Sequence, residues 1–120
     1  MLQRLGLIGY GNMGEAIVSG LKTRNPDLEL GLVEVSEERR AEAMRTHGAR
    51  DFTESLAQLV SFSDVVVLGI KPQDVEPMIE RLTPISGELK LVSILAGTPL
   101  SRFTGRLETK NIARFMPSLA

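Results

Sequence analysis

The sequence has no cysteine among its 120 residues. This absence excludes disulfides, thiolate metal sites and a cysteine nucleophile. The sequence also has no apolar run as long as a membrane-spanning helix, which needs about 20 residues. Its first residues lack the basic n-region, the apolar h-region and the small-residue cleavage site of a signal peptide. We therefore expect a cytoplasmic protein that makes no contact with a membrane.

An excess of charge of one sign is also missing, because 14 basic residues against 15 acidic ones give a net charge of −1. This balance provides no bulk attraction to nucleic acid, and we expect none as a partner. The only histidine, His47, falls at the end of a predicted helix, where its charge suits the helix dipole. No spacing of His, Asp and Glu residues indicates a metal site or a pair of carboxylates for acid–base catalysis. We therefore nominate no metal ligand and no catalytic residue.

Strand-like and helix-like segments alternate along the chain. Short apolar runs predict strands over residues 5–9, 30–35, 49–52, 65–70, 91–95 and 111–115. Helical spacing and capping residues predict helices over residues 12–24, 36–47, 53–60 (or beginning at residue 55), 72–82 and 100–107. Such alternation is typical of a parallel sheet covered on both faces. We expect an α/β fold: a Rossmann-type doubly wound parallel sheet in a single three-layer domain (residues 1–120), with strand order 3-2-1-4-5-6.

Glycines at positions 9, 11 and 14 form a G-x-G-x-x-G motif between the first strand and the first helix. In a dinucleotide site each of them has a physical role. Gly9 lets the chain turn sharply, Gly11 leaves room for a pyrophosphate beside the backbone, and Gly14 lets the helix pack closely. The helix then directs its first N–H groups and the positive end of its dipole at the phosphates. The alternative is a tight strand–helix turn that binds no ligand.

The end of the second strand bears on which dinucleotide binds. Glu34 lies 20 residues after Gly14, where a carboxylate accepts hydrogen bonds from an adenosine ribose 2′-OH and repels a 2′-phosphate. This favours NAD. Ser36, Arg39 and Arg40 follow, and hydroxyl and guanidinium groups suit the phosphate of NADP. The alternatives are a solvated helix face for the arginines and an exposed strand end for Glu34, so the choice of cofactor stays open.

Two further turns fall at the same predicted edge of the sheet. Lys71-Pro72 follows the fourth strand, where a lysine faces the crevice and can contact the cofactor ribose or an acidic substrate. Ala96-Gly97 follows the fifth strand and offers small residues against which a nicotinamide ring can lie. A surface lysine and an ordinary turn glycine are the respective alternatives.

Five motifs can be read together: Ile8-Gly-Tyr-Gly-Asn-Met-Gly-Glu-Ala-Ile17, Ser36-Glu-Glu-Arg-Arg40, Asp64-Val-Val-Val-Leu-Gly-Ile-Lys-Pro-Gln73, Ser93-Ile-Leu-Ala-Gly97 and Arg114-Phe-Met-Pro117. In this order and spacing they resemble the N-terminal domain of the pyrroline-5-carboxylate reductase family. The resemblance implies a reductase of proline biosynthesis, which passes hydride from NADPH or NADH to the imine carbon of 1-pyrroline-5-carboxylate. The cofactor-binding residues indicated by the motifs and the resemblance are Gly9, Tyr10, Gly11, Asn12, Met13, Gly14, Glu34, Ser36, Ile70, Lys71, Pro72, Ala96, Gly97, Met116 and Pro117.

The chain departs from that family in four respects. Met116-Pro-Ser-Leu-Ala120 replaces the usual Met-Pro-Asn-Thr/Ser-Pro, and Leu56 stands where an asparagine often touches the adenosine ribose. Glu34 is more typical of NAD than of the family's usual NADP. The family also has a second, helical domain, which builds the dimer and much of the substrate pocket and which these 120 residues do not contain. We therefore expect the isolated domain to turn over poorly. A homo-oligomer, if one forms, would use that second domain.

Other functions stay open beside the leading one. They are a related β-hydroxyacid or F420-type NADP oxidoreductase, a non-catalytic nucleotide-binding module and an S-adenosylmethionine-dependent methyltransferase. Lys71-Pro72 and Ala96-Gly97 argue against the methyltransferase.

Overall fold

The protein, described over residues 2–115 by a computed structural model, is built on a six-stranded sheet in the order β3-β2-β1-β4-β5-β6. All neighbouring strands are parallel. The predicted α/β fold and strand order are therefore confirmed. The strands are β1 (Arg4–Ile8), β2 (Glu29–Val33), β3 (Arg50–Asp51), β4 (Val65–Leu68), β5 (Leu91–Ser93) and β6 (Ile112–Arg114).

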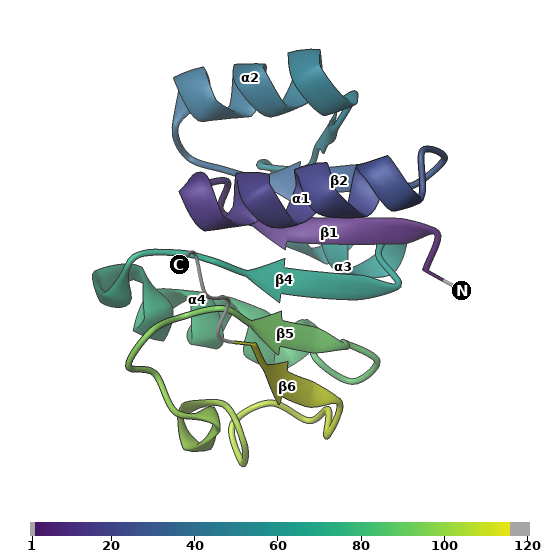
Figure 1. The fold of residues 1–120 in the computed structure, drawn as a ribbon. Helices are drawn as coiled ribbons and strands as arrows, with labels where there is room; N and C mark the ends of the chain where they lie inside the picture. Colours follow the sequence, from purple (N-terminus) through teal and green to yellow (C-terminus); the bar gives the residue numbers. More distant parts are fainter. Residues whose placement is uncertain (1, 116–120) are drawn as a thin grey trace.

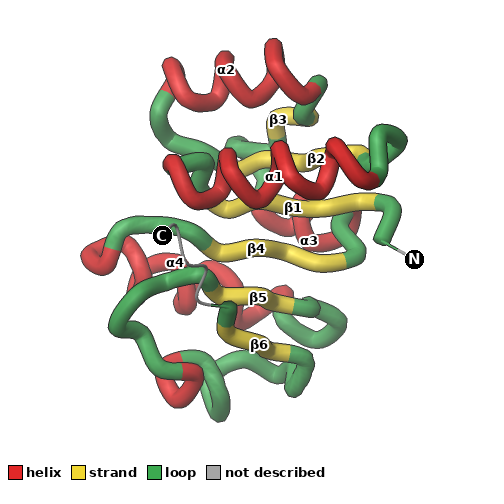
Figure 2. The backbone as a smooth tube through the Cα atoms, in the orientation of Figure 1, coloured by secondary structure: helices red, strands yellow, loops and turns green. Residues whose placement is uncertain are grey.

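Helices cover both faces of this sheet (Figure 1). Helices α1 (Asn12–Arg24) and α2 (Glu37–His47) lie on one face, and α3 (Leu56–Phe62) and α4 (Val75–Leu82) lie on the other. The predicted ends of α2 are confirmed, because the Ser36 hydroxyl accepts a hydrogen bond from the N–H of Arg39, and Gly48 ends the helix in the left-handed conformation. In Figure 2, α1 lies in front of the strands and α3 and α4 lie behind them, while α2 is drawn at the β3 side of the sheet.

Each face of the sheet has its own apolar core, because successive side chains of a strand point to opposite faces. Leu5 and Leu7 of β1 pack with Val18 of α1 and Ala43 of α2. Ile8, the next residue of β1, belongs to the other core, which also holds the buried residues of α3 and α4. The continuous apolar runs in β1 and β4 therefore reflect burial on both sides.

Two paired glycines let α3 approach the sheet closely. Gly6 of β1 lies opposite Gly31 of β2. A Cβ on Gly6 would collide with the side chain of Ser63, and one on Gly31 would come within 3.0 Å of Phe62 and Leu59. The side chains of α3 and of the residue after it thus fill the space that side chains on these strands would otherwise occupy.

Two predicted helices are wrong in extent. The segment predicted as a helix over residues 72–82 begins as a 3₁₀ turn, η1 (Pro72–Asp74), and becomes α-helical only at Val75. The segment over residues 100–107 forms only a 3₁₀ turn, η3 (Leu100–Arg102). There Gly105 adopts φ +85°, which ends helical geometry although Phe103 and Leu107 are buried at a helix-like spacing. Within residues 2–115, no helix is long and apolar enough to cross a membrane.

Candidate active site at the carboxyl ends of the strands

The first turn of the candidate site connects β1 to α1. Gly9 has φ +94°, and its N–H donates to the carbonyl oxygen of Val33 at 2.9 Å. The N–H of Gly69, which follows β4, donates to the carbonyl oxygen of Ile8, also at 2.9 Å. The turn is thereby held at the edge where the carboxyl ends of β1, β2 and β4 meet, the edge at which open α/β sheets bind ligands.

The start of α1 has the shape of an anion cradle. Its N-cap is Gly11, which offers no side chain to cap the first N–H groups of the helix. A Cβ built on Gly11 would meet no atom within 4 Å, so the space beside this residue is open. A Cβ on Gly14 would lie 3.3 Å from the carbonyl oxygen of Gly9, so a side chain here would press on the turn. The residues present therefore fit a phosphate group at the helix N-terminus.

A pocket of about 600 Å³, called here the β2-side pocket, opens on one side of the glycine turn. Its apolar lining includes three buried residues, Ile8, Val33 and Met78. Its charged and polar lining residues are Glu34, Ser36, Arg39, Lys71, Asp74 and Arg81. An apolar base with charged groups around it suits an aromatic ring attached to a polar sugar and phosphate.

A second pocket of about 310 Å³, the β5-side pocket, opens on the other side of the turn. Its lining combines the start of α1 with the segments that follow β4 and β5, and it includes Asn12, Met13, Gly14, Pro72, Ile94, Leu95, Ala96 and Thr98. Gly11, Gly69 and Ile70 line both pockets. The two pockets are therefore adjacent, and Gly11 lies on the boundary between them.

Glu34 lies at the end of β2 with both carboxylate oxygens engaged. Oε1 accepts the N–H of Tyr10 at 2.7 Å, and Oε2 accepts the N–H of Ser36 at 2.9 Å. The carboxylate thus bridges the glycine turn and the loop that leads into α2. The sequence predicts for Glu34 either a contact with a ribose hydroxyl or an exposed strand end, and neither prediction includes these two hydrogen bonds.

Arg39 and Arg40, which the sequence does not distinguish, make different contacts in the structure. The Nη1 of Arg40 donates to the carbonyl oxygen of Glu34 at 2.8 Å, and its Nε lies 3.5 Å from a carboxylate oxygen of Asp51. Arg40 therefore fastens β2 to β3 and contributes nothing to the pocket lining. Arg39 lines the β2-side pocket, and its Nη1 donates to the carbonyl oxygen of Tyr10 at 3.1 Å. Of these two neighbouring arginines, Arg39 is therefore the one that lines the pocket.

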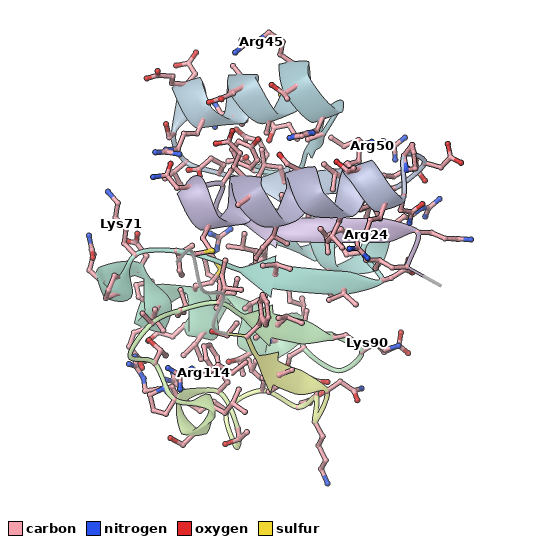
Figure 3. The ribbon with its side chains drawn as sticks, in the orientation of Figure 1. Arg24, Arg45, Arg50, Lys71, Lys90 and Arg114 are labelled. Carbon is pink, nitrogen blue, oxygen red and sulfur yellow. The ribbon has the colours of Figure 1, made fainter. Side chains whose placement is uncertain are left out.

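The predicted residues after β4 and β5 lie at the same edge. Figure 3 shows Lys71 extending outward from the loop after β4, and its exposed side chain contributes to the β2-side pocket. Pro72 and Ala96 line the β5-side pocket. Gly97 has φ +71° and is exposed beside that pocket without lining it. The predictions for Met116 and Pro117 fall outside the described residues.

Tyr10 is placed differently from the other residues of the glycine motif. Its side chain is 1% exposed and packs in the core with α1 and α2, where its ring meets that of His47 edge-on at 6.3 Å. Burial, followed by the charges of Glu15 and Glu42, raises the pKa of Tyr10. Within residues 2–115, neither the Tyr10 hydroxyl nor His47 Nε2 has a hydrogen-bond partner. Tyr10 therefore presents only its backbone to the turn.

Several lining residues lie outside the motifs that the sequence shows. Met78 and Arg81 come from α4, and Thr98 comes from the turn after β5. These residues belong to no motif, and only the packing of α4 against the sheet brings the first two to the pocket. Leu56, which stands where the related family often has asparagine, is buried in the core and is not part of either lining.

The sheet, the glycine turn and the paired pockets define a Rossmann-type domain, the class in which nucleotide-dependent oxidoreductases hold their coenzyme at this edge. A family model described as NADP oxidoreductase coenzyme F420-dependent matches residues 4–97. The chain belongs to this family.

Pyrroline-5-carboxylate reductases are among the proteins most similar to the chain. It is 38% identical over 119 residues to that of Vibrio alginolyticus, covering 97% of this chain and 43% of the relative. It is 33% identical over 118 residues to that of Pseudomonas aeruginosa, covering 96% of this chain and 43% of the relative. The solved pyrroline-5-carboxylate reductase of Coxiella burnetii superposes with a TM-score of 0.84 at 27% identity, covering 98% and 44%. The resemblance that the motifs indicate is confirmed, and the chain spans less than half the length of these relatives.

Proposed function

We propose that the chain is the coenzyme-binding part of a pyrroline-5-carboxylate reductase and binds NADPH or NADH across the glycine turn. The observation that carries this proposal is the meeting of two pockets at Gly11, beside the N-terminus of α1. A dinucleotide consists of two nucleosides joined by a pyrophosphate, and this arrangement matches that shape. The adenosine would occupy the β2-side pocket and the nicotinamide the smaller β5-side pocket.

The residues of this chain would bind, orient and shield the coenzyme. The N–H groups at the start of α1 would hold the pyrophosphate, and Arg39 and Ser36 would meet the adenosine ribose or its phosphate. Ile70 and Ala96 would form an apolar wall for the nicotinamide ring. When bound, the coenzyme supplies the hydride for the imine carbon of 1-pyrroline-5-carboxylate. The imine π electrons pass to nitrogen, which takes a proton, and L-proline results.

The greater length of the relatives bears on what the 120 residues do alone. We propose that a second region, beyond those that match this chain, supplies much of the substrate pocket and the contacts between subunits of a homo-oligomer. The 120 residues would then bind coenzyme weakly and reduce the imine substrate negligibly. In line with the resemblance, we assign this activity to the cytoplasm.

Parallel titrations with NADH and NADPH test this proposal. We expect a change in nicotinamide fluorescence below millimolar coenzyme for at least one of the two. No change for either at millimolar concentration would contradict coenzyme binding. Proline formation by the 120 residues at the rate of a complete reductase would contradict the proposed need for a second region.

The family match supports a second candidate function. Because the matching family model is named for coenzyme F420-dependent NADP oxidoreductases, the domain also fits a reductase whose second substrate is F420. A chain extended to the length of the relatives distinguishes the two candidates. Assays with 1-pyrroline-5-carboxylate, reduced and oxidised F420 and a set of β-hydroxyacids should give activity with the imine alone.

A further inference from the structure

The carboxylate of Glu34 connects two loops that bear on coenzyme binding. It accepts one hydrogen bond from the glycine turn, at the Tyr10 N–H, and one from the loop before α2, at the Ser36 N–H. Both are charge-assisted and are therefore stronger than bonds between neutral groups. The 2.7 Å distance to the Tyr10 nitrogen is at the short end of the range for such bonds.

Glu34 is itself held in place through its backbone. Its N–H donates to the hydroxyl of Thr53 at 3.1 Å, and its carbonyl oxygen accepts from Arg40 at 2.8 Å. Arg40 is paired with Asp51, whose other carboxylate oxygen accepts the N–H of Thr53 at 2.9 Å. The Glu34 side chain therefore extends from a backbone fixed to the end of β3, so it is a firm support for the turn.

The peptide groups on either side of Tyr10 are both fixed from this region. Glu34 holds the Tyr10 N–H, and Arg39 holds the Tyr10 carbonyl oxygen at 3.1 Å. A peptide unit is planar and trans, so the direction of the Tyr10 carbonyl also sets the direction of the Gly11 N–H on its opposite side. Since Gly11 lies between the two pockets, these contacts determine how the backbone meets a pyrophosphate.

We propose that Glu34 is a positioning residue that sets the shape of the glycine turn, so that NADH and NADPH depend on it equally. This rests on the proposed binding of a dinucleotide. It differs from direct recognition of the ribose, in which a carboxylate attracts a 2′-OH, repels a 2′-phosphate and therefore favours NADH. Both oxygens of Glu34 already accept backbone N–H groups, and the partner of one of them is the turn itself.

Glu34→Gln tests this inference with Glu38→Gln as its control. The first variant keeps the size of the side chain but replaces one acceptor oxygen with an NH₂ group, which cannot accept from an N–H. Glu38 is exposed in the first turn of α2 and is not in the lining of either pocket in the described chain, so its variant removes the same charge without touching the turn. Affinities for NADH and NADPH are measured for wild type and both variants.

Glu34→Gln should weaken NADH and NADPH alike by about tenfold, as expected for loss of a charge-assisted bond, while Glu38→Gln should change either by less than about twofold. The amide resonances of Tyr10 and Ser36 in the ligand-free protein should shift in Glu34→Gln and stay unchanged in Glu38→Gln, because only Glu34 accepts hydrogen bonds from these two N–H groups. Weaker NADH with stronger NADPH would overturn the inference in favour of direct ribose recognition, and unchanged affinities would also overturn it. Binding of neither coenzyme to wild type would instead refute the proposed function.

Discussion

The carbonyl oxygen of Gly69 occupies the space that a Cβ on Gly9 would need. Gly9 also has φ +94°, a backbone conformation that residues with a side chain rarely adopt. Gly9→Ala should therefore destabilise the fold by at least about 2 kcal/mol, from backbone strain and the collision with a rigid backbone atom. Urea denaturation measures this loss, and a variant as stable as wild type would show that the turn relaxes freely.

Gly11→Ala should behave in the opposite way. Gly11 has φ −89°, and its added Cβ would meet nothing within 4 Å, so the free energy of unfolding should change by less than about 0.5 kcal/mol. Because the new methyl group would stand where the pyrophosphate approaches the backbone, NADH and NADPH should bind at least about tenfold more weakly. Fluorescence titration measures the affinity. Unchanged affinity in a stable variant would contradict a pyrophosphate site beside Gly11.

Substitution of Arg40 should mainly change the free energy of unfolding, whereas substitution of Arg39 should mainly change coenzyme affinity. Arg40→Ala removes a bond to the Glu34 carbonyl and a contact with Asp51, and it should cost about 1–2 kcal/mol of unfolding free energy. Arg39→Ala removes only the bond to the Tyr10 carbonyl oxygen, so it should cost less stability than Arg40→Ala. It should weaken both coenzymes, NADPH more than NADH, because the guanidinium lines the pocket proposed for the adenosine end. Equal losses of both coenzymes in Arg39→Ala would exclude a specific contact with the 2′-phosphate.

Asp64 should contribute to the acid sensitivity of the fold. The N–H groups of Gln3 and Arg4 donate to its carboxylate, and these bonds hold the pKa of Asp64 below its usual 3.8. The lowered pKa means that this stabilisation is present above pH 3.8 and declines as the pH falls through the lowered folded value. Asp64→Asn should lower Tm by a few degrees at pH 7 and by less at pH 2. An equal shift of Tm at both pH values would contradict this linkage.

The positions of the main strands and helices could be predicted because their signals are local and agree with one another, and the glycine turn after the first strand then predicted the strand order. The apolar run at Val65-Val-Val-Leu68 indicates a central strand, and Ser36 and Gly48 mark the two ends of α2 by side-chain and backbone chemistry. The prediction of a helix over residues 100–107 is wrong because Phe103 and Leu107, both buried, are four positions apart, a spacing that is also typical of one face of a helix. Periodicity cannot reveal that Gly105 reverses the backbone between them.

The site could be predicted only in part, because some of its residues are adjacent to motifs and others reach it only through packing. The glycine turn and the residues after β4 and β5 are adjacent to motifs, and parallel strands bring their carboxyl ends together. The lining that comes from α4, Met78 and Arg81, depends on how that helix packs. The engagement of Glu34 with the Tyr10 N–H depends on a bond between residues 24 positions apart, which spacing does not encode.

The shared boundary of the two pockets has a consequence for ligands of different length. A dinucleotide that fills both pockets behaves as two tethered ligands, and the tether raises the effective concentration of each half at its own pocket. AMP and nicotinamide mononucleotide, added together, should therefore displace NADH only at concentrations at least about 100-fold above its dissociation constant. A competition titration measures this ratio. With the proposed binding mode, the glycine turn would select for the connection between the two nucleotides and so discriminate against the abundant mononucleotides of a cell.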